Sequence, residues 1–168
     1  NKLNLKFNKK FGTKEELIKT LFNKQNNKSF AQAYAGHQFG NFTKLGDGRS
    51  LMIGEFKSDN NEVFDIQLKG SGRTLYSRNG DGKATLKTML REFLVSEAMH
   101  YLNISSSRSL ALIKTGEKIY RDDEHDGGLL VRIMKSHIRI GTFEYANYFG
   151  SKYDLKKLTD YSINLSLI

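Results

Sequence analysis

The chain has 168 residues, of which 38% are hydrophobic and 27% are charged, a balance typical of a folded domain rather than a disordered segment. No apolar run approaches the roughly 18 residues of a membrane helix, and the absence of cysteine excludes disulfides, thiolate metal sites and a cysteine nucleophile. The net charge of +9 is compatible with three kinds of partner: nucleic acid, an anionic membrane surface or a phosphate-rich small ligand. Lacking a secretory signal as well, the sequence favours the reducing cytoplasm of a bacterium and no membrane partner.

The first half of the chain predicts one helix and two strands. Thr13 and Glu16 form a capping box that predicts a helix through Phe22. The glycine-punctuated, aromatic stretch 31–48 is expected to be mostly loop. Strands are expected at 50–56 and 62–69, joined by a polar hairpin turn. Alternation in the second strand puts its last residue, a lysine, on the polar face.

The second half predicts a long helix packed on further strands. A loop with four glycines, 70–82, leads into a helix expected at about 85–102. Its apolar stripe comprises Leu86, Met89, Leu90, Phe93 and Tyr101. Three strands are expected at 109–115, 118–121 and 128–134, followed by helices at 142–149 and 155–163. The sequence therefore predicts an α+β fold with a mostly antiparallel sheet and a long packed helix.

Three stretches have residues suited to binding an anion. In Gly46-Asp47-Gly48-Arg49 the glycines free the backbone for close approach and the arginine can bind phosphate, although a plain Asp-Gly turn has the same sequence. Lys69, at a strand end, can reach a phosphate or can be an exposed edge lysine. Gly80-Asp81-Gly82 precedes a helix, where it can form an anion site, a helix cap or both.

Two further questions of pairing arise from spacing. A phosphate-binding lysine usually needs a carboxylate to fix its position, and Glu92 and Glu97 on the long helix compete for Lys69. The helical wheel alone favours Glu97, which lies inside the apolar stripe. Arg132 and Arg139 would point to opposite faces of one unbroken strand, so they can bind one phosphate only if the chain breaks between them.

Weaker signals come from an aromatic cluster and an acidic turn. Tyr34, His37 and Phe39 are active-site candidates, but such clusters more often serve packing. The acidic stretch 122–126 has residue types that bind metals, yet its Gly-Gly ending indicates a solvated turn.

Taken together, these stretches resemble the SelO (selenoprotein O) family of protein adenylyltransferases. The motifs, in the family's order and spacing, are Ala33-Tyr-Ala-Gly-His-Gln-Phe-Gly40, Leu45-Gly-Asp-Gly-Arg49, Gln67-Leu-Lys-Gly70, Tyr76-Ser-Arg-Asn-Gly-Asp-Gly82, Arg91-Glu-Phe-Leu-Val-Ser-Glu-Ala98 and Ser136-His-Ile-Arg139. The resemblance runs from about Phe30 to the end. It divides the chain into an N-terminal extension with one helix, 1–29, and a nucleotide-binding lobe, 30–168.

The resemblance implies a protein-kinase-like fold whose full enzyme uses ATP and Mg²⁺ to transfer AMP to Ser, Thr or Tyr hydroxyls of proteins. It assigns nucleotide binding to Gly46, Gly48, Arg49, Lys69, Asp81, Gly82, Arg132 and Arg139. It favours Glu92 over Glu97 as the partner of Lys69. The family has proline near Leu75, Ser105 and Lys135, and arginine in place of Lys83, so the sequence departs from the family at these positions.

The family's catalytic base and metal ligands lie beyond residue 168. We therefore expect no catalytic and no metal-binding residue in this chain, which would be a kinase-like N-lobe truncated before the catalytic lobe and inactive alone. A separate polypeptide supplying the missing lobe is the other possibility. A different class of function, a non-catalytic basic module that binds nucleic acid, is supported only by the net charge.

Overall fold

The computed structural model describes residues 29–58 and 61–166. The helix expected from Thr13 to Phe22 lies outside these residues. The fold is mixed α+β, with two antiparallel sheets and three helices in the described part. This confirms the expected α+β class with antiparallel sheets. No described helix is long and apolar enough to cross a membrane.

The first sheet is a two-stranded hairpin of β1 (Ala33–Gln38) and β2 (Asn41–Gly46). The expectation of a loop over 31–48 was therefore wrong. The strands meet at Phe39 and Gly40, whose φ angles of 53° and 79° give the two left-handed residues of a type I′ turn. Asn-Gly and Asp-Gly are the usual signals for this turn, and Phe-Gly is neither, which explains why the hairpin was missed.

The second sheet consists of β3 (Ser50–Lys57), β4 (Val63–Lys69), β5 (Ala84–Thr85), β6 (Arg108–Tyr120) and β7 (Glu124–Met134). Its order is β3-β4-β7-β5, and β6 pairs with the other edge of β7. β3 and β4 confirm the first two predicted strands. The separate strands expected at 109–115 and 118–121 are instead one long strand, β6, with an irregularity between Lys114 and Lys118 that includes Gly116 at a φ of 81°.

β7 is the centre of the core. Leu129, Leu130 and Val131 are all fully or almost fully buried, although successive side chains of a strand point to opposite faces. Leu68 packs with Leu129 and Val131, while Met89 packs with Leu130. Both faces of β7 are therefore covered, which gives the residue that follows this run, Arg132, a rigid support.

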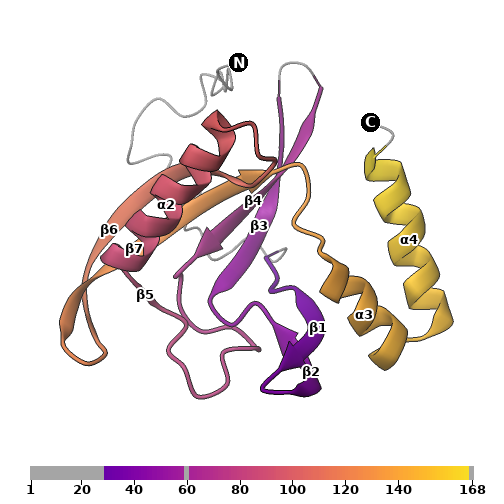
Figure 1. Cartoon of the computed structure of the whole chain (residues 1–168), viewed down its shortest axis with the longest axis horizontal. Helices are drawn as coiled ribbons and strands as arrows, with labels where there is room; N and C mark the ends of the chain where they lie inside the picture. Colours follow the sequence, from indigo (N-terminus) through magenta and orange to yellow (C-terminus); the bar gives the residue numbers. More distant parts are fainter. Residues whose placement is uncertain (1–28, 59–60, 167–168) are drawn as a thin grey trace.

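The long helix α2 (Leu86–Tyr101) packs on β6 and β7, as expected (Figure 1). Thr85 caps it by accepting from the backbone N–H of Thr88. Met89 is buried, but Leu90 and Tyr101, which the apolar stripe placed toward the core, are exposed. The stripe was therefore predicted too wide.

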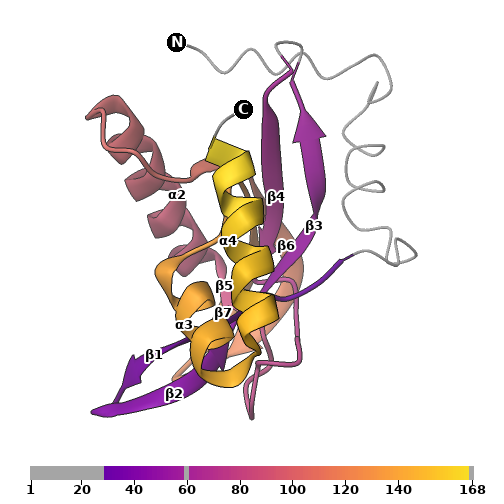
Figure 2. The ribbon, with the colours of Figure 1, turned by 90° about the vertical axis from the view of Figure 1, so that its right-hand side faces the viewer.

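Two shorter helices complete the described chain. α3 (Ile140–Phe149) and α4 (Lys152–Ser166) confirm the expected helices and begin two or three residues earlier. α3 contacts both β1 and α4. Figure 1 shows α3 and α4 together on the side of the molecule away from α2, and Figure 2 shows this side facing the viewer.

Candidate functional site

A pocket of about 460 Å³ opens where the β1–β2 hairpin, the ends of β3 and β4, the glycine loop 70–82 and the segment after β7 meet. Its size is in the range of small-molecule sites. Every residue that the sequence assigned to nucleotide binding lines it, namely Gly46, Gly48, Arg49, Lys69, Asp81, Gly82, Arg132 and Arg139. Tyr34 also lines it, and the guanidinium of Arg139 lies 4.7 Å from the Tyr34 ring.

Lys69 is the last residue of β4 and is paired with Glu92 of α2. Its Nζ lies 2.7 Å from Oε2 and 2.9 Å from Oε1 of that carboxylate. Burial lowers the pKa of Lys69, and the hydrogen bond and charge of Glu92 oppose this shift. The ion pair fixes the position of the Lys69 Nζ at the pocket wall.

Glu97, which the helical wheel favoured, has another partner. Its carboxylate binds the guanidinium of Arg108 at 2.7 and 2.9 Å and accepts from the backbone N–H of Ser109 at 3.1 Å. The wheel correctly placed Glu97 toward the sheet, but the strand it faces is β6.

Arg132 and Arg139 reach the same pocket because the strand ends between them. β7 stops at Met134, and Arg139 is the N-cap residue of α3. Arg132 donates to Gln67 at 2.9 Å and to Ser107 at 2.8 Å, and its Nε lies 3.3 Å from Glu92. Burial lowers the pKa of Arg132, although a guanidinium stays charged in proteins.

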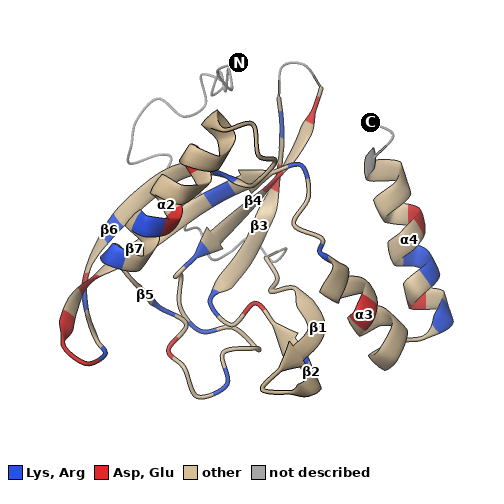
Figure 3. Ribbon diagram, in the orientation of Figure 1, with Lys and Arg blue, Asp and Glu red and all other residues tan. Residues whose placement is uncertain are grey.

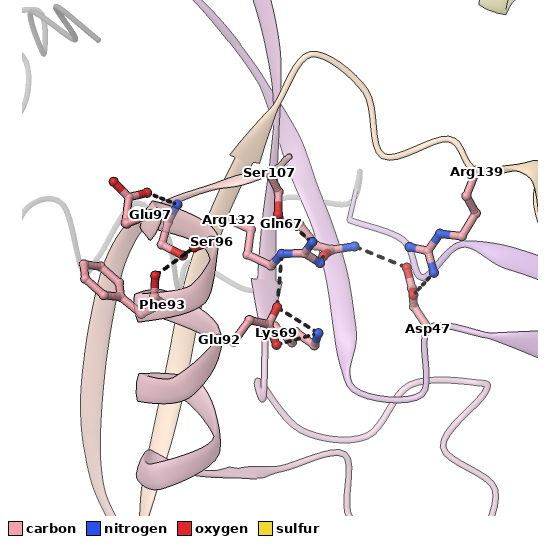
Figure 4. A network of polar contacts seen from close by, with 11 residues as sticks. Asp47, Gln67, Lys69, Glu92, Phe93, Ser96, Glu97, Ser107, Arg132 and Arg139 are labelled. Carbon is pink, nitrogen blue, oxygen red and sulfur yellow. Dashed lines mark hydrogen bonds and ion pairs between the residues drawn. The ribbon is translucent and has the colours of Figure 1, made fainter. Parts of the chain in front are cut away.

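Gln67 and Asp47 are site residues that sequence reasoning did not single out. Gln67 is fully buried, and its amide donates to Asp47 at 3.3 Å while its carbonyl accepts from Arg132. Asp47 also binds Arg139 at 3.2 Å. Figure 4 shows one continuous network running from Lys69 through Glu92, Arg132, Gln67 and Asp47 to Arg139. The signal that could have revealed Gln67 was its place as a polar residue on a central strand, because a buried polar side chain needs hydrogen-bond partners.

The glycine loop 70–82 closes on itself beside the pocket. The backbone N–H of Gly72 donates to the carbonyl of Gly82 at 3.1 Å, and Ser71 pairs with Lys83. Gly82 has a φ of 67°, and a side chain there would overlap the Gly72 carbonyl. Only glycine fits this position without strain.

The sequence model of the family "Protein adenylyltransferase SelO" matches residues 1–166. The chain belongs to the SelO family. The match includes residues 1–29, which the motifs had left outside the resemblance. A protein nucleotidyltransferase YdiU from Clostridium botulinum (strain Alaska E43) is 60% identical over 137 residues, covering 82% of this chain and 28% of that protein.

Two other proteins of the same name show the same pattern. The protein from Clostridium perfringens (strain SM101) is 50% identical over 171 residues, covering 96% of this chain and 35% of that relative. The protein from Brevibacillus brevis is 59% identical over 133 residues, covering 79% and 27%. The chain thus spans about a third or less of the curated SelO relatives that it matches.

The charge of the SelO pocket suits an anion better than a metal ion. Five Lys or Arg side chains line it, against two carboxylates, Asp47 and Asp81, both already engaged in ion pairs. In 29–58 and 61–166 no group of three or more metal-ligating side chains occurs. These residues therefore do not fit a complete magnesium site.

The net charge does not single out a nucleic-acid surface. Residues 1–28 contain eight of the 27 Lys and Arg residues and two of the 18 Asp and Glu residues, so they account for +6 of the +9. Residues 29–168 are left with +3. Across the described residues both signs of charge are interspersed (Figure 3). The basic composition alone therefore gives little support to a nucleic-acid module.

Proposed function

We propose that this chain is the phosphate-binding part of a protein adenylyltransferase, which transfers AMP from ATP to Ser, Thr or Tyr hydroxyls of proteins. The observation that carries the proposal is the pocket at the end of β4, where Lys69 is fixed by Glu92 and joined by three arginines. Cations held in fixed positions are what phosphoryl chemistry requires of a protein, because most of the catalysis is positioning and charge stabilisation.

We further propose that residues 30–168 form a kinase-like N-lobe and that 1–29 are an extension of it. In protein kinases a strand lysine that binds ATP phosphates pairs with a glutamate on a helix. Lys69 on β4 and Glu92 on α2 form such a pair, 23 residues apart in sequence.

In this proposal the residues divide into three roles. Arg49, Lys69, Arg132 and Arg139 neutralise the phosphates. Gly46 and Gly48 let the backbone approach the nucleotide, and the Asp81-Gly82 segment closes the pocket from the side of the loop.

The chemical step needs groups that the described residues do not supply. A protein hydroxyl attacks the α-phosphate of ATP, and its proton passes to a base. Pyrophosphate leaves, and AMP remains bonded to the protein oxygen. Mg²⁺ would neutralise phosphate charge during this step. We propose that the base and the magnesium ligands of the full-length enzyme lie outside this segment, on the same or a separate chain. A cytoplasmic location stays a prediction from the absence of cysteine.

The test is ATP binding by calorimetry with Mg²⁺, comparing the chain with its Lys69→Ala variant. The matched control is Lys87→Ala, which removes an exposed lysine of α2 that does not line the pocket. We expect Lys69→Ala to weaken binding about tenfold or more, the effect of losing one charge-assisted phosphate contact. Lys87→Ala should stay within about twofold.

Two results would contradict the proposal. Equal ATP binding by the Lys69→Ala variant would remove Lys69 from the site. Transfer of AMP from labelled ATP by the 168-residue chain alone would show that the base and metal ligands are within it, contrary to the proposed division.

A further inference from the structure

Asp81 of the glycine loop has both carboxylate oxygens engaged outside the pocket network. Oδ1 accepts from the backbone N–H of Lys83 at 2.9 Å and from Arg121 at 2.8 Å, and Oδ2 accepts from Arg121 at 2.9 Å. The hydrogen bonds from Arg121 lower the pKa of Asp81, and the same bonds raise the pKa of Arg121. This is a two-pronged arginine–carboxylate pair, the stronger kind of surface ion pair.

Arg121 comes from a distant part of the fold and does not itself line the pocket. It follows β6 directly, at the turn into β7, 40 residues after Asp81 in sequence. It also donates to the carbonyl of Lys83 at 3.3 Å, while the side chain of Lys83 binds Glu117 of β6 at 3.1 Å. The β6–β7 hairpin thus contacts the end of the loop and the residue after it through three interactions.

We propose that Arg121 is a positioning residue for the nucleotide, and that the Asp81 carboxylate acts through Arg121 instead of binding the nucleotide. Arg121 would fix the Gly80-Asp81-Gly82 segment at the wall of the pocket. It also neutralises Asp81, whose negative charge would otherwise repel a triphosphate among the lining cations. This inference rests on the proposed function.

The two effects predict an uncommon result in a double variant. Arg121→Gln releases the loop and leaves Asp81 as an uncompensated negative charge, so ATP binding should weaken about three- to tenfold. Asp81→Asn releases the loop without leaving that charge, so its loss should be smaller. The double variant should bind ATP as well as, or better than, Arg121→Gln alone.

The experiment is calorimetry of ATP with Mg²⁺ on the whole chain and these three variants, with Arg121→Lys and Lys118→Gln added. Arg121→Lys keeps the positive charge but loses the bidentate guanidinium geometry, so its ATP affinity should lie between those of the wild type and Arg121→Gln. Lys118→Gln is the matched control, because Lys118 lies in β6 of the same hairpin and pairs with Glu124 and Asp126, not with the loop. It should change affinity less than twofold.

Amide hydrogen exchange of residues 70–83, measured without nucleotide, reports the anchoring separately. We expect faster exchange in Arg121→Gln and no change in Lys118→Gln. Two outcomes would overturn the inference: unchanged exchange in Arg121→Gln, or a double variant that binds ATP more weakly than Arg121→Gln, since Asp81 would then touch the nucleotide independently. If the wild type binds no ATP, the proposed function fails, and the exchange result still decides whether Arg121 anchors the loop.

Discussion

Glu92→Gln is the substitution that best separates the positioning of the pocket cations from the stability of the fold. It removes one negative charge while keeping the size of the side chain, and it leaves Lys69 and Arg132 without their shared counter-charge. The Lys69 and Glu92 side chains are 20% and 26% exposed. Exposed ion pairs contribute up to about 1 kcal/mol, and removing one partner of a fully buried pair costs about 3–5 kcal/mol. A loss of about 2 kcal/mol in the free energy of unfolding is therefore expected.

The same helix offers a matched control, Glu97→Gln. Glu97 and Arg108 are each 22% exposed, so the loss of unfolding free energy should again be about 2 kcal/mol. Glu97 does not line the pocket and has no contact with Lys69 or Arg132 among the described ion pairs. Urea unfolding at pH 7 measures the two stabilities, and calorimetry measures ATP binding below the transition.

We expect the two variants to be similarly destabilised but only Glu92→Gln to weaken ATP binding, by about tenfold, because its lysine and arginine lose their fixed positions. If Glu97→Gln weakened binding equally, the effect would come from general loosening of α2. If Glu92→Gln left both quantities unchanged, the ion pair would not hold the site, and the reasoning given above would be refuted.

Three further predictions concern the backbone, the core and pH. Gly82→Ala should destabilise the fold by more than about 2 kcal/mol in thermal unfolding, because the new side chain overlaps the backbone in addition to the strain of a left-handed conformation. The control Gly116→Ala has the left-handed strain but open space around it, and should cost only about 1 kcal/mol. Met89→Ala should cost about 2–5 kcal/mol in urea unfolding, and the exposed Leu94→Ala less than about 0.5 kcal/mol. Since burial lowers the pKa of Lys69, the folded state releases that proton before the unfolded state does, so stability relative to Lys69→Met should rise as the pH approaches 10.5, and a fall would contradict this sign.

Local patterns predicted most of the fold. Period-2 alternation predicted β4, the polar hairpin turn predicted β3 beside it, and the apolar stripe predicted α2; helices were also expected where α3 and α4 lie. The two errors in strand assignment occurred where a residue adopts the left-handed conformation. Phe39 turned an expected loop into a hairpin, and Gly116 sits in an irregularity inside a strand that was expected to end there. Phe-Gly is not a usual signal for a two-residue hairpin turn, and a glycine within a strand pattern can mark either a bulge or the end of the strand.

The candidate site was less predictable than the fold, because spacing gives the face of an element and not its neighbour. The wheel placed Glu97 toward the sheet, and it does face β6, but only the family resemblance indicated Glu92 for Lys69. Gln67 lay in a family motif but was assigned no role, and Arg121 lay in none of the motifs. Their partners lie 20 to 65 residues away in sequence and are brought close in space by the pairing of strands.

In the proposed function, the buried amide of Gln67 would let such distant residues act as one phosphate site. Asp47 holds Arg139 and Glu92 holds Lys69 and Arg132, and Gln67 joins these two groups by bonding Asp47 and Arg132. These three cations are therefore held in position in the structure without a nucleotide, so nucleotide binding would not need to order their side chains. A neutral amide is suited to this link because it can donate to the carboxylate and accept from the guanidinium at once, which neither an acidic nor a basic side chain could do in its charged form.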